Sequence, residues 1–111
     1  MCEYFVKADP ILFESRSRTV RIHGALTSIR LENLMWDVLA EMAAAEHLTT
    51  SGLISRFHNE IMASGIEALN FASFLRVTCV RYMRKQLDEL KSERKPVLQS
   101  ASNLVSLRAQ N

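Results

Sequence analysis

The feature of this sequence that most constrains its fold is a change of hydrophobic period at Asn33. Before it, Ile29 and Leu31 alternate with Ser28 and Arg30, which is the pattern of a half-buried β-strand. After it, apolar residues recur at the spacing of an amphipathic helix. These are Met35, Trp36, Leu39, Met42 and Ala43. The sequence therefore predicts a strand that is followed directly by a helix.

A second alternation lies upstream of that strand. Val20 and Ile22 alternate with polar residues, and Gly24 separates this run from the next one. Glycine permits the sharp turns that connect neighbouring strands. Two arrangements remain open for residues 18–24: a hairpin with the following strand, or a segment that covers its outer face.

Start and stop signals divide the rest of the chain into three helices. The first is expected to run from residue 33 to about residue 46, and the hydroxyl-rich segment 47–51 then supplies the N-cap of a second helix. Gly65 is expected to end that second helix, and Asn70 to cap a third and longer one. We expect Pro96 to end the third helix, because proline disrupts a helix interior.

Length and composition fit one small, mostly helical domain. Of the 111 residues only three are glycine and two are proline, and so few chain breaks disfavour a turn-rich β-sandwich. We expect residues 1–17 to form an N-terminal arm and residues 18–95 to form the domain. Residues 96–111 are expected to be a mobile C-terminal tail.

The reactive residue types indicate neither an enzyme nor a metal or cofactor site. Cys2 and Cys79 form no CxxC pair, and the three histidines match no zinc motif. The chain contains no phosphate-binding loop, dinucleotide fingerprint or nucleophile elbow. No apolar run approaches the roughly 18 residues of a membrane span. We interpret both cysteines as reduced thiols of a cytoplasmic protein, with Cys79 as a small apolar residue on a helix.

The predicted strand would be unstable in a monomer. A lone strand leaves its backbone donors and acceptors unpaired. Two copies solve this problem if their strands pair antiparallel across a two-fold axis, with the helices of both copies closing one core beneath them. The pattern therefore predicts a homodimer with an intermolecular antiparallel β-ribbon.

The order of these elements resembles a known family of DNA-binding domains. The run TSIRLENLMWDVLAEMAAAEHLTTSGLI, residues 27–54, is similar to the ribbon-helix-helix family without gaps. The run NFASFLRVTCVRYMR, residues 70–84, resembles a bacterial subfamily with an added C-terminal helix. The resemblance implies a mostly α, ribbon-helix-helix homodimer with an extra third helix. Two positions depart from the pattern, since His47 stands where glycine is usual and Gly52 lies inside the second helix.

The resemblance implies that the strand enters the major groove of DNA. Thr27, Ile29 and Leu31 then face the core, and Leu26, Ser28 and Arg30 face the base edges. An arginine can make a bidentate pair with guanine, a serine can donate or accept, and a leucine can contact a thymine methyl group. Leu26, Ser28 and Arg30 are therefore the candidate base-reading residues.

Phosphate contacts are expected at the start of the second helix. Free amides, hydroxyl groups and the positive end of the helix dipole favour an anion there. Between Glu14 and Glu32 the chain has no acidic residue and four arginines, a charge distribution that attracts a phosphate backbone. The candidate phosphate-contacting residues are Thr49, Thr50, Ser51, Arg18 and Arg21.

These expectations describe a sequence-specific DNA-binding transcriptional regulator from a bacterium. Its predicted partners are double-stranded DNA and a second copy of the chain, with a higher oligomer on DNA left open. Two other functions also remain open. One is an antitoxin-type regulator that binds a small toxin partner, and the other is a protein-interaction dimer that has lost DNA binding.

Overall fold

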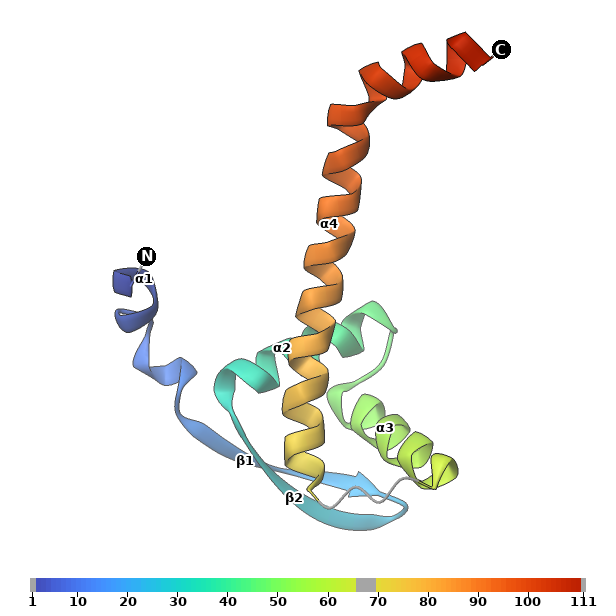
Figure 1. Cartoon of the computed structure of the whole chain (residues 1–111). Coiled ribbons are helices and arrows are strands. Elements are labelled where there is room, and N and C mark those ends of the chain that lie inside the picture. The colour runs from blue at the N-terminus through green and yellow to red at the C-terminus, as the bar shows by residue number, and fades with distance from the viewer. Residues whose placement is uncertain (1, 66–69, 111) are drawn as a thin grey trace. The chain divides into compact units, whose positions relative to one another are not determined.

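The computed structural model describes residues 2–65 and 70–110, with side chains for residues 3–65 and 70–93. The chain divides into two compact units, Met1–Cys79 and Val80–Asn111. The elements, labelled in Figure 1, are α1 (Cys2–Val6), a 3-10 helix η1 (Pro10–Leu12), β1 (Ser15–Ile22), β2 (Ala25–Glu32), α2 (Asn33–Ala45), α3 (Thr50–Ser64) and α4 (Phe71–Gln110). The predicted mostly helical composition with a short sheet is confirmed.

The two strands form a hairpin within one chain. They pair antiparallel along their full length, from Ser15 opposite Glu32 to Ile22 opposite Ala25. The connecting residues His23 and Gly24 have φ angles of 51° and 80°. Positive φ at both central residues defines the type I′ turn, whose twist matches that of the flanking strands. Of the two arrangements left open for residues 18–24, the hairpin is therefore the one observed.

The backbone partner of β2 lies in the same chain. The prediction that β2 finds a backbone partner only in a second copy is wrong, because β1 of the same chain pairs with all of it. The alternating segment upstream of Gly24 forms the partner strand, β1. This strand begins at Ser15, so the last residues of the predicted arm 1–17 belong to the sheet.

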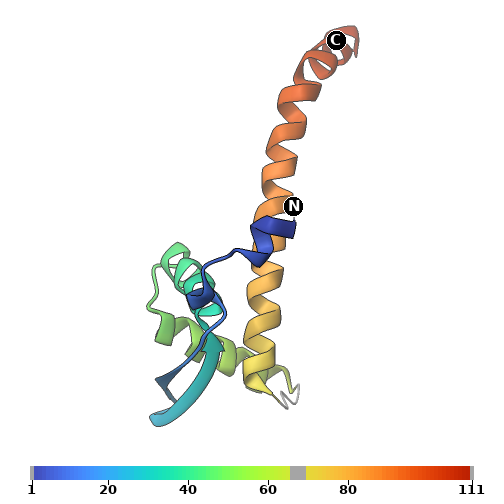
Figure 2. The same cartoon turned by 90° about the vertical axis from the view of Figure 1, so that its left-hand side faces the viewer.

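The helices α2 and α3 lie on one face of the hairpin (Figure 1 and Figure 2). The strand residues that point toward them are buried: Val20, Ile22, Ile29 and Leu31. The largest fully buried side chains of the described residues come from β2, α2, α3 and the first turns of α4. They are Leu31, Leu39, Ile54, Leu75 and Cys79. One continuous apolar core therefore holds the hairpin against the helices, as the alternating pattern predicts.

The predicted boundaries of α2 and α3 are confirmed by their caps. The amide of Leu48 donates to the carbonyl of Ala43 at 2.8 Å, and that of His47 to Ala44 at 3.1 Å. This pair of hydrogen bonds is the Schellman motif. It places His47 in the left-handed region, with φ 57°. Gly65 ends α3 with φ 73°.

The segment before the hairpin is tied to the start of α2. The backbone amide of Asn33 donates to the carbonyl of Glu14 at 2.8 Å. Its side-chain amide donates to the carbonyl of Ile11 at 2.9 Å. A side-chain oxygen of Asp9 caps η1 by accepting from the amide of Ile11. One asparagine thus anchors the N-terminal segment at both η1 and the beginning of β1.

The last helix is longer than expected. Asn70 caps α4 as predicted, since its side-chain oxygen accepts from the amide of Ser73 at 3.2 Å. The prediction that Pro96 ends the helix is wrong, because α4 continues to Gln110. A proline removes only one amide donor and crowds one carbonyl, so a helix can continue through it with a bend. Figure 1 shows such a change of direction in the orange-to-red part of α4.

Candidate nucleic-acid interface

The hairpin exposes one face to solvent. Cross-strand neighbours in an antiparallel sheet point to the same side. The pairs Ser17–Arg30, Thr19–Ser28 and Arg21–Leu26 therefore share one face, opposite the side that packs on the helices. All six side chains are exposed. We call this set the outer ribbon face: Ser17, Thr19, Arg21, Leu26, Ser28 and Arg30.

The chemistry of the outer ribbon face suits hydrogen bonding to an anionic, polar partner. Arg21 on β1 and Arg30 on β2 lie toward opposite ends of it, with hydroxyl groups between them. Among the described residues neither guanidinium is part of an ion pair. Arg21 makes one local bond, from Nη1 to the carbonyl of Gly24 at 3.3 Å. Leu26 is 68% exposed, so the face also offers one apolar contact.

All three predicted base-reading residues are thus brought together. Leu26, Ser28 and Arg30 are alternate residues of β2, they share the outer ribbon face, and nothing in the described chain covers them. Residues 18–24 lie beside β2 in the same sheet and not across it. The alternation in the sequence was sufficient to find this set, because a period of two fixes the face of every residue once one face is buried.

The four arginines of the acid-free stretch divide between the two faces. Arg16 and Arg18 alternate with the outer set. The guanidinium carbon of Arg18 lies 5.1 Å from the ring centroid of Trp36, within the range of a cation–π interaction. The indole nitrogen of Trp36 donates to the carbonyl of Arg16 at 2.9 Å.

A hollow of about 340 Å³ lies at this inner edge. It is lined by Ile11, Leu12, Arg16, Arg18, Asn33, Trp36, Asp37 and Ala40. The sequence grouped Arg18 and Arg21 as phosphate contacts, but the structure places their side chains on opposite faces of the sheet.

The start of α3 presents the predicted hydroxyl cluster. Thr49 is the N-cap, and its Oγ1 accepts from the amide of Gly52 at 3.0 Å. A hydroxyl that accepts in this way can still donate its own hydrogen to another acceptor. The amides of Thr50 and Ser51 have no partner inside the helix, as at any helix start. The capping role of Thr49 is therefore confirmed. The start of α3 offers three potential donors to an anion, which are the hydroxyl of Thr49 and the amides of Thr50 and Ser51.

Gly52 has a role that the sequence did not reveal. A Cβ atom at this position would lie 3.2 Å from Oγ1 of Thr49 and 3.9 Å from Leu48. A side chain there would press on the capping hydroxyl. Glycine has a low helix propensity, so the sequence alone gives no reason for Gly52 inside α3. The structure gives one, because the amide of Gly52 is the one that Thr49 caps and a side chain there would crowd the capping oxygen.

Side-chain contacts join the hairpin to α3. The hydroxyl of Ser55 donates to the carbonyl of Arg21 at 2.9 Å. Near the turn, the rings of His23 and His58 lie edge to face with centroids 5.3 Å apart. His58 packs in the same way on Phe71. The sequence did not predict these contacts, because residues so distant in sequence carry no spacing signal.

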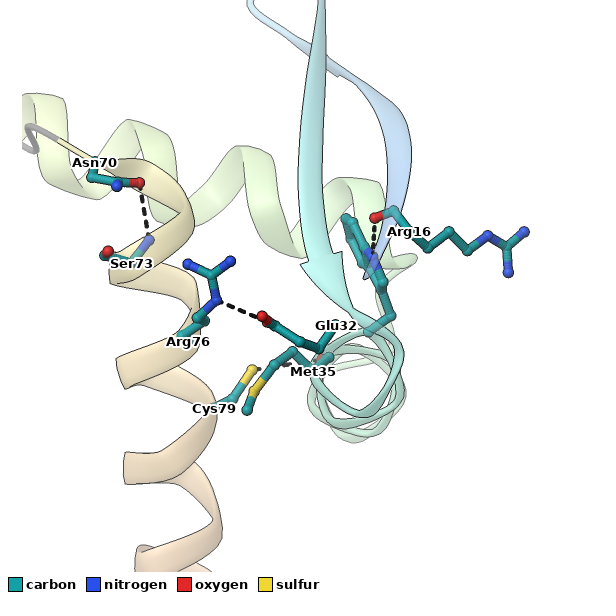
Figure 3. A network of polar contacts seen from close by, with 8 residues as sticks. Arg16, Glu32, Met35, Asn70, Ser73, Arg76 and Cys79 are labelled. Carbon is teal, nitrogen blue, oxygen red and sulfur yellow. Dashed lines mark hydrogen bonds and ion pairs between the residues drawn. The ribbon is translucent and has the colours of Figure 1, made fainter. Parts of the chain in front are cut away.

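The acidic residue that ends β2 is paired. Nε of Arg76 donates to Oε1 of Glu32 at 2.8 Å, as Figure 3 shows. This hydrogen bond from Arg76 holds the pKa of Glu32 below its usual value. A hydrogen bond from the backbone amide of Glu32 lowers that pKa further. The negative charge nearest in sequence to Arg30 is therefore balanced by a cation. Cys79, one turn further along α4, donates to the carbonyl of Met35 at 3.6 Å.

The described part of the chain has neither a metal site nor a membrane-spanning helix. No group of three histidine, cysteine or acidic side chains there is arranged to hold a metal ion. No described helix is long and apolar enough to cross a membrane.

Comparisons with known proteins agree with this geometry. A solved structure of an uncharacterized protein from Bordetella pertussis Tohama I is similar with a TM-score of 0.74 and 44% sequence identity, covering 80% of this chain and 71% of that one. Among curated proteins, none matches the sequence significantly. The sequence model of the family described as "Ribbon-helix-helix domain" matches residues 15–83, from the start of β1 into α4. The chain therefore belongs to the ribbon-helix-helix domain family.

Proposed function

We propose that this protein is a sequence-specific DNA-binding transcriptional regulator that reads the major groove as a homodimer. The observation that carries the proposal is the outer ribbon face, which is exposed and lies on a hairpin of a ribbon-helix-helix domain. Its two arginines stand among hydroxyl groups and form no ion pair with the described residues. Membership of this family supports both DNA binding and dimerisation. The bacterial cytoplasm as its location, and the lack of an enzymatic activity, belong to the same proposal.

Base reading is assigned to β2. Arg30 can donate two parallel hydrogen bonds to O6 and N7 of a guanine, and Ser28 can bond to several base edges. Leu26 supplies apolar contact to a thymine methyl group. A bidentate arginine–guanine pair is worth about 1–3 kcal/mol of discrimination. Arg30 is therefore the residue on which sequence specificity chiefly depends.

Phosphate contacts are assigned to the start of α3 and to β1. Thr49 can donate its hydroxyl hydrogen, and the free amides of Thr50 and Ser51 favour an anion at the same point. Arg21 adds a cation on the outer ribbon face that forms no ion pair with the described residues. Arg18 stays a predicted phosphate contact, although its stacking on Trp36 turns it away from that face.

The hairpin changes how two copies would form the ribbon. One edge of β2 is paired with β1, and no other strand of the described residues pairs with its second edge. Pairing of β2 with β2 of a second copy gives the strand order β1-β2-β2-β1. With strands about 4.8 Å apart, the two inner strands fit a groove about 12 Å wide and the outer strands reach its rims. This arrangement puts Arg30 over bases and Arg21 near the backbone.

Selection of bound sequences from a random DNA pool tests the proposal. We expect a palindromic site, because two copies related by a two-fold axis read two equivalent half-sites. Binding to that site, measured at several salt concentrations, should weaken in Arg30→Ala and lose preference at one base of each half-site. Arg81→Ala, which removes the same charge from a residue without an assigned role, is the control. Absence of DNA binding at about 50 mM salt would refute the proposal.

The two other predicted functions give different results in simple experiments. An antitoxin-type regulator would co-purify with a small neighbour-encoded protein. A dimer that has lost DNA binding would be expected to have residues 18–24 across its outer face, and the hairpin leaves that face exposed.

A further inference from the structure

The second unit carries an apolar stripe that none of its described side chains covers. Val80, Met83, Leu87 and Leu90 are 51%, 46%, 51% and 58% exposed. All four lie on α4, and their neighbours on the other sides of the helix are charged or polar. Contiguous exposed apolar side chains of this size mark an interaction surface more often than a solvent-facing one. We call these four residues the α4 seam.

The spacing of the α4 seam is that of a coiled coil. The steps between its residues are three, four and three positions, so the stripe repeats every 3.5 residues and stays on one side of a slightly supercoiled helix. Val80 and Leu87 take the a positions, and Met83 and Leu90 take the d positions. Val80 at a and Leu90 at d match the preference of two-stranded pairs for a β-branched residue at a and leucine at d, whereas Leu87 at a and Met83 at d do not. A helix with this repeat is complementary to a second copy of itself.

We propose that the α4 seam pairs with the α4 seam of a second copy as a parallel, two-stranded coiled coil. The charged residues beside it decide the direction. In a parallel pair, each g position lies near the following e position of the other helix. That brings Gln86 near Lys91 of the partner subunit and sets no like charges together. An antiparallel pair that sets Met83 opposite Leu87 of the partner subunit would place the two copies of Arg84 near each other, where the two cations repel.

The extent of the pairing is limited by the sequence. Arg94 occupies the next a position and Pro96 follows within the same turn. Two heptads are fewer than the three or four that a free-standing coiled coil needs. The α4 seam therefore adds affinity to a dimer that another contact also holds. This inference goes beyond the proposed function, because it assigns a second self-association surface outside the hairpin and makes no use of DNA.

One pair of variants of the full chain tests whether the seam holds two copies together. Leu90→Glu places a carboxylate in the seam, whereas Ser92→Glu adds the same charge at the outward f position of the same turn. Sedimentation equilibrium should show the dimer dissociation constant rising about 100-fold in Leu90→Glu, given the apolar area lost from both copies. It should change by less than about threefold in Ser92→Glu. Circular dichroism checks that both variants fold.

A cross-linking experiment tests the direction of pairing. Leu87→Cys in a Cys2→Ser background puts equivalent a positions next to each other only in a parallel pair, so oxidation should give a covalent dimer. The same change at Lys85, an f position, should give none. Equal dissociation constants for Leu90→Glu and Ser92→Glu would overturn the proposal, as would a wild-type chain that stays monomeric. Preferential cross-linking of a Met83→Cys, Leu87→Cys mixture over Leu87→Cys alone would overturn its parallel direction.

Discussion

Arg76 and Glu32, 44 residues apart in sequence, form a hydrogen-bonded ion pair that joins the first turns of α4 to the end of β2. The two side chains are 38% and 34% exposed, so water screens their charges in part. The pair lies where β2 passes directly into α2, and Glu32 has no capping bond of its own to that helix. Its carboxylate instead accepts the hydrogen bond from Arg76 and so holds the first turns of α4.

A double-mutant cycle of Glu32→Gln and Arg76→Gln should reveal this link. Because the pair is partly exposed, we expect a coupling free energy of about 0.5–1 kcal/mol at pH 7. The pKa of Glu32 is lowered by Arg76, so this stabilisation is present above the usual glutamate pKa and disappears as pH falls through the lowered value. Urea unfolding at pH 7 and at about pH 2 measures both. A coupling that persists at the lower pH would contradict this account.

Cys79 should be unreactive in the folded protein. Burial raises the pKa of its thiol to about 11, so at pH 8 only about one molecule in a thousand carries the reactive thiolate. In a Cys2→Ser background, an aromatic disulfide reagent should label Cys79 at the rate of unfolding and at once in urea. Above about pH 9 the unfolded thiol ionises and the folded one does not, so this residue should lower stability as pH rises toward 11. Fast labelling without denaturant would count against the buried position.

His47 and Gly65 end successive helices in the left-handed region but differ in side chain. His47→Gly should raise the free energy of unfolding by about 0.5–1 kcal/mol, since glycine adopts φ 57° without strain. Gly65→Ala should lower it by about 1–2 kcal/mol at φ 73°. Thermal unfolding of both variants gives the comparison. Opposite signs are the expected result, and equal signs would mean that the backbone strain at His47 is already relieved.

Thr49 allows the capping and phosphate roles to be separated. Thr49→Asp keeps a good N-cap and should change stability by less than about 0.5 kcal/mol. Its carboxylate would repel a phosphate, so DNA affinity should fall about tenfold or more. Thr49→Ser keeps both the cap and a donor, and serves as the matched control. If Thr49→Asp binds DNA as well as Thr49→Ser does, no phosphate lies at the start of α3.

Arg18 and Arg21 offer a test of the two faces. Arg21→Ala should weaken binding to all DNA sequences and reduce the salt dependence by about one counterion per copy. Arg18→Ala should reduce that dependence by less, because Arg18 stacks on Trp36, and should also lower stability by about 0.5–1 kcal/mol through loss of this contact. Titrations across a salt series distinguish the two variants. A larger reduction in Arg18→Ala than in Arg21→Ala would make Arg18 the main phosphate contact of β1 in place of Arg21.

Local signals in the sequence were enough to locate α2 and α3. Thr49 marks the start of α3 and Gly65 its end, and both signals are local because capping depends on residues within one turn. Alternation likewise assigned Ser28 and Arg30 to the exposed face of β2. Periodicity states which face a residue takes, but it does not name the neighbouring strand, and so β1 was left with two possible positions.

The missed features all depend on contacts between distant residues or on tolerance of a local penalty. No spacing rule links Glu32 to Arg76, or Ser55 to Arg21, because tertiary packing alone brings them together. Pro96 was expected to end a helix, yet the residues around it are mostly good helix formers and the helix continues. The phosphate and base contacts themselves stay predictions until DNA binding is measured.

The hydrogen bond from Ser55 to the carbonyl of Arg21 has a consequence for the alignment of the hairpin. A slip of β1 by one residue would exchange its two faces, turning Arg21 inward and bringing its apolar neighbours out to solvent. The same slip would move that carbonyl away from the serine hydroxyl. Ser55 therefore penalises misalignment directly, and mutations at this position in α3 should act on DNA recognition without ever touching the nucleic acid.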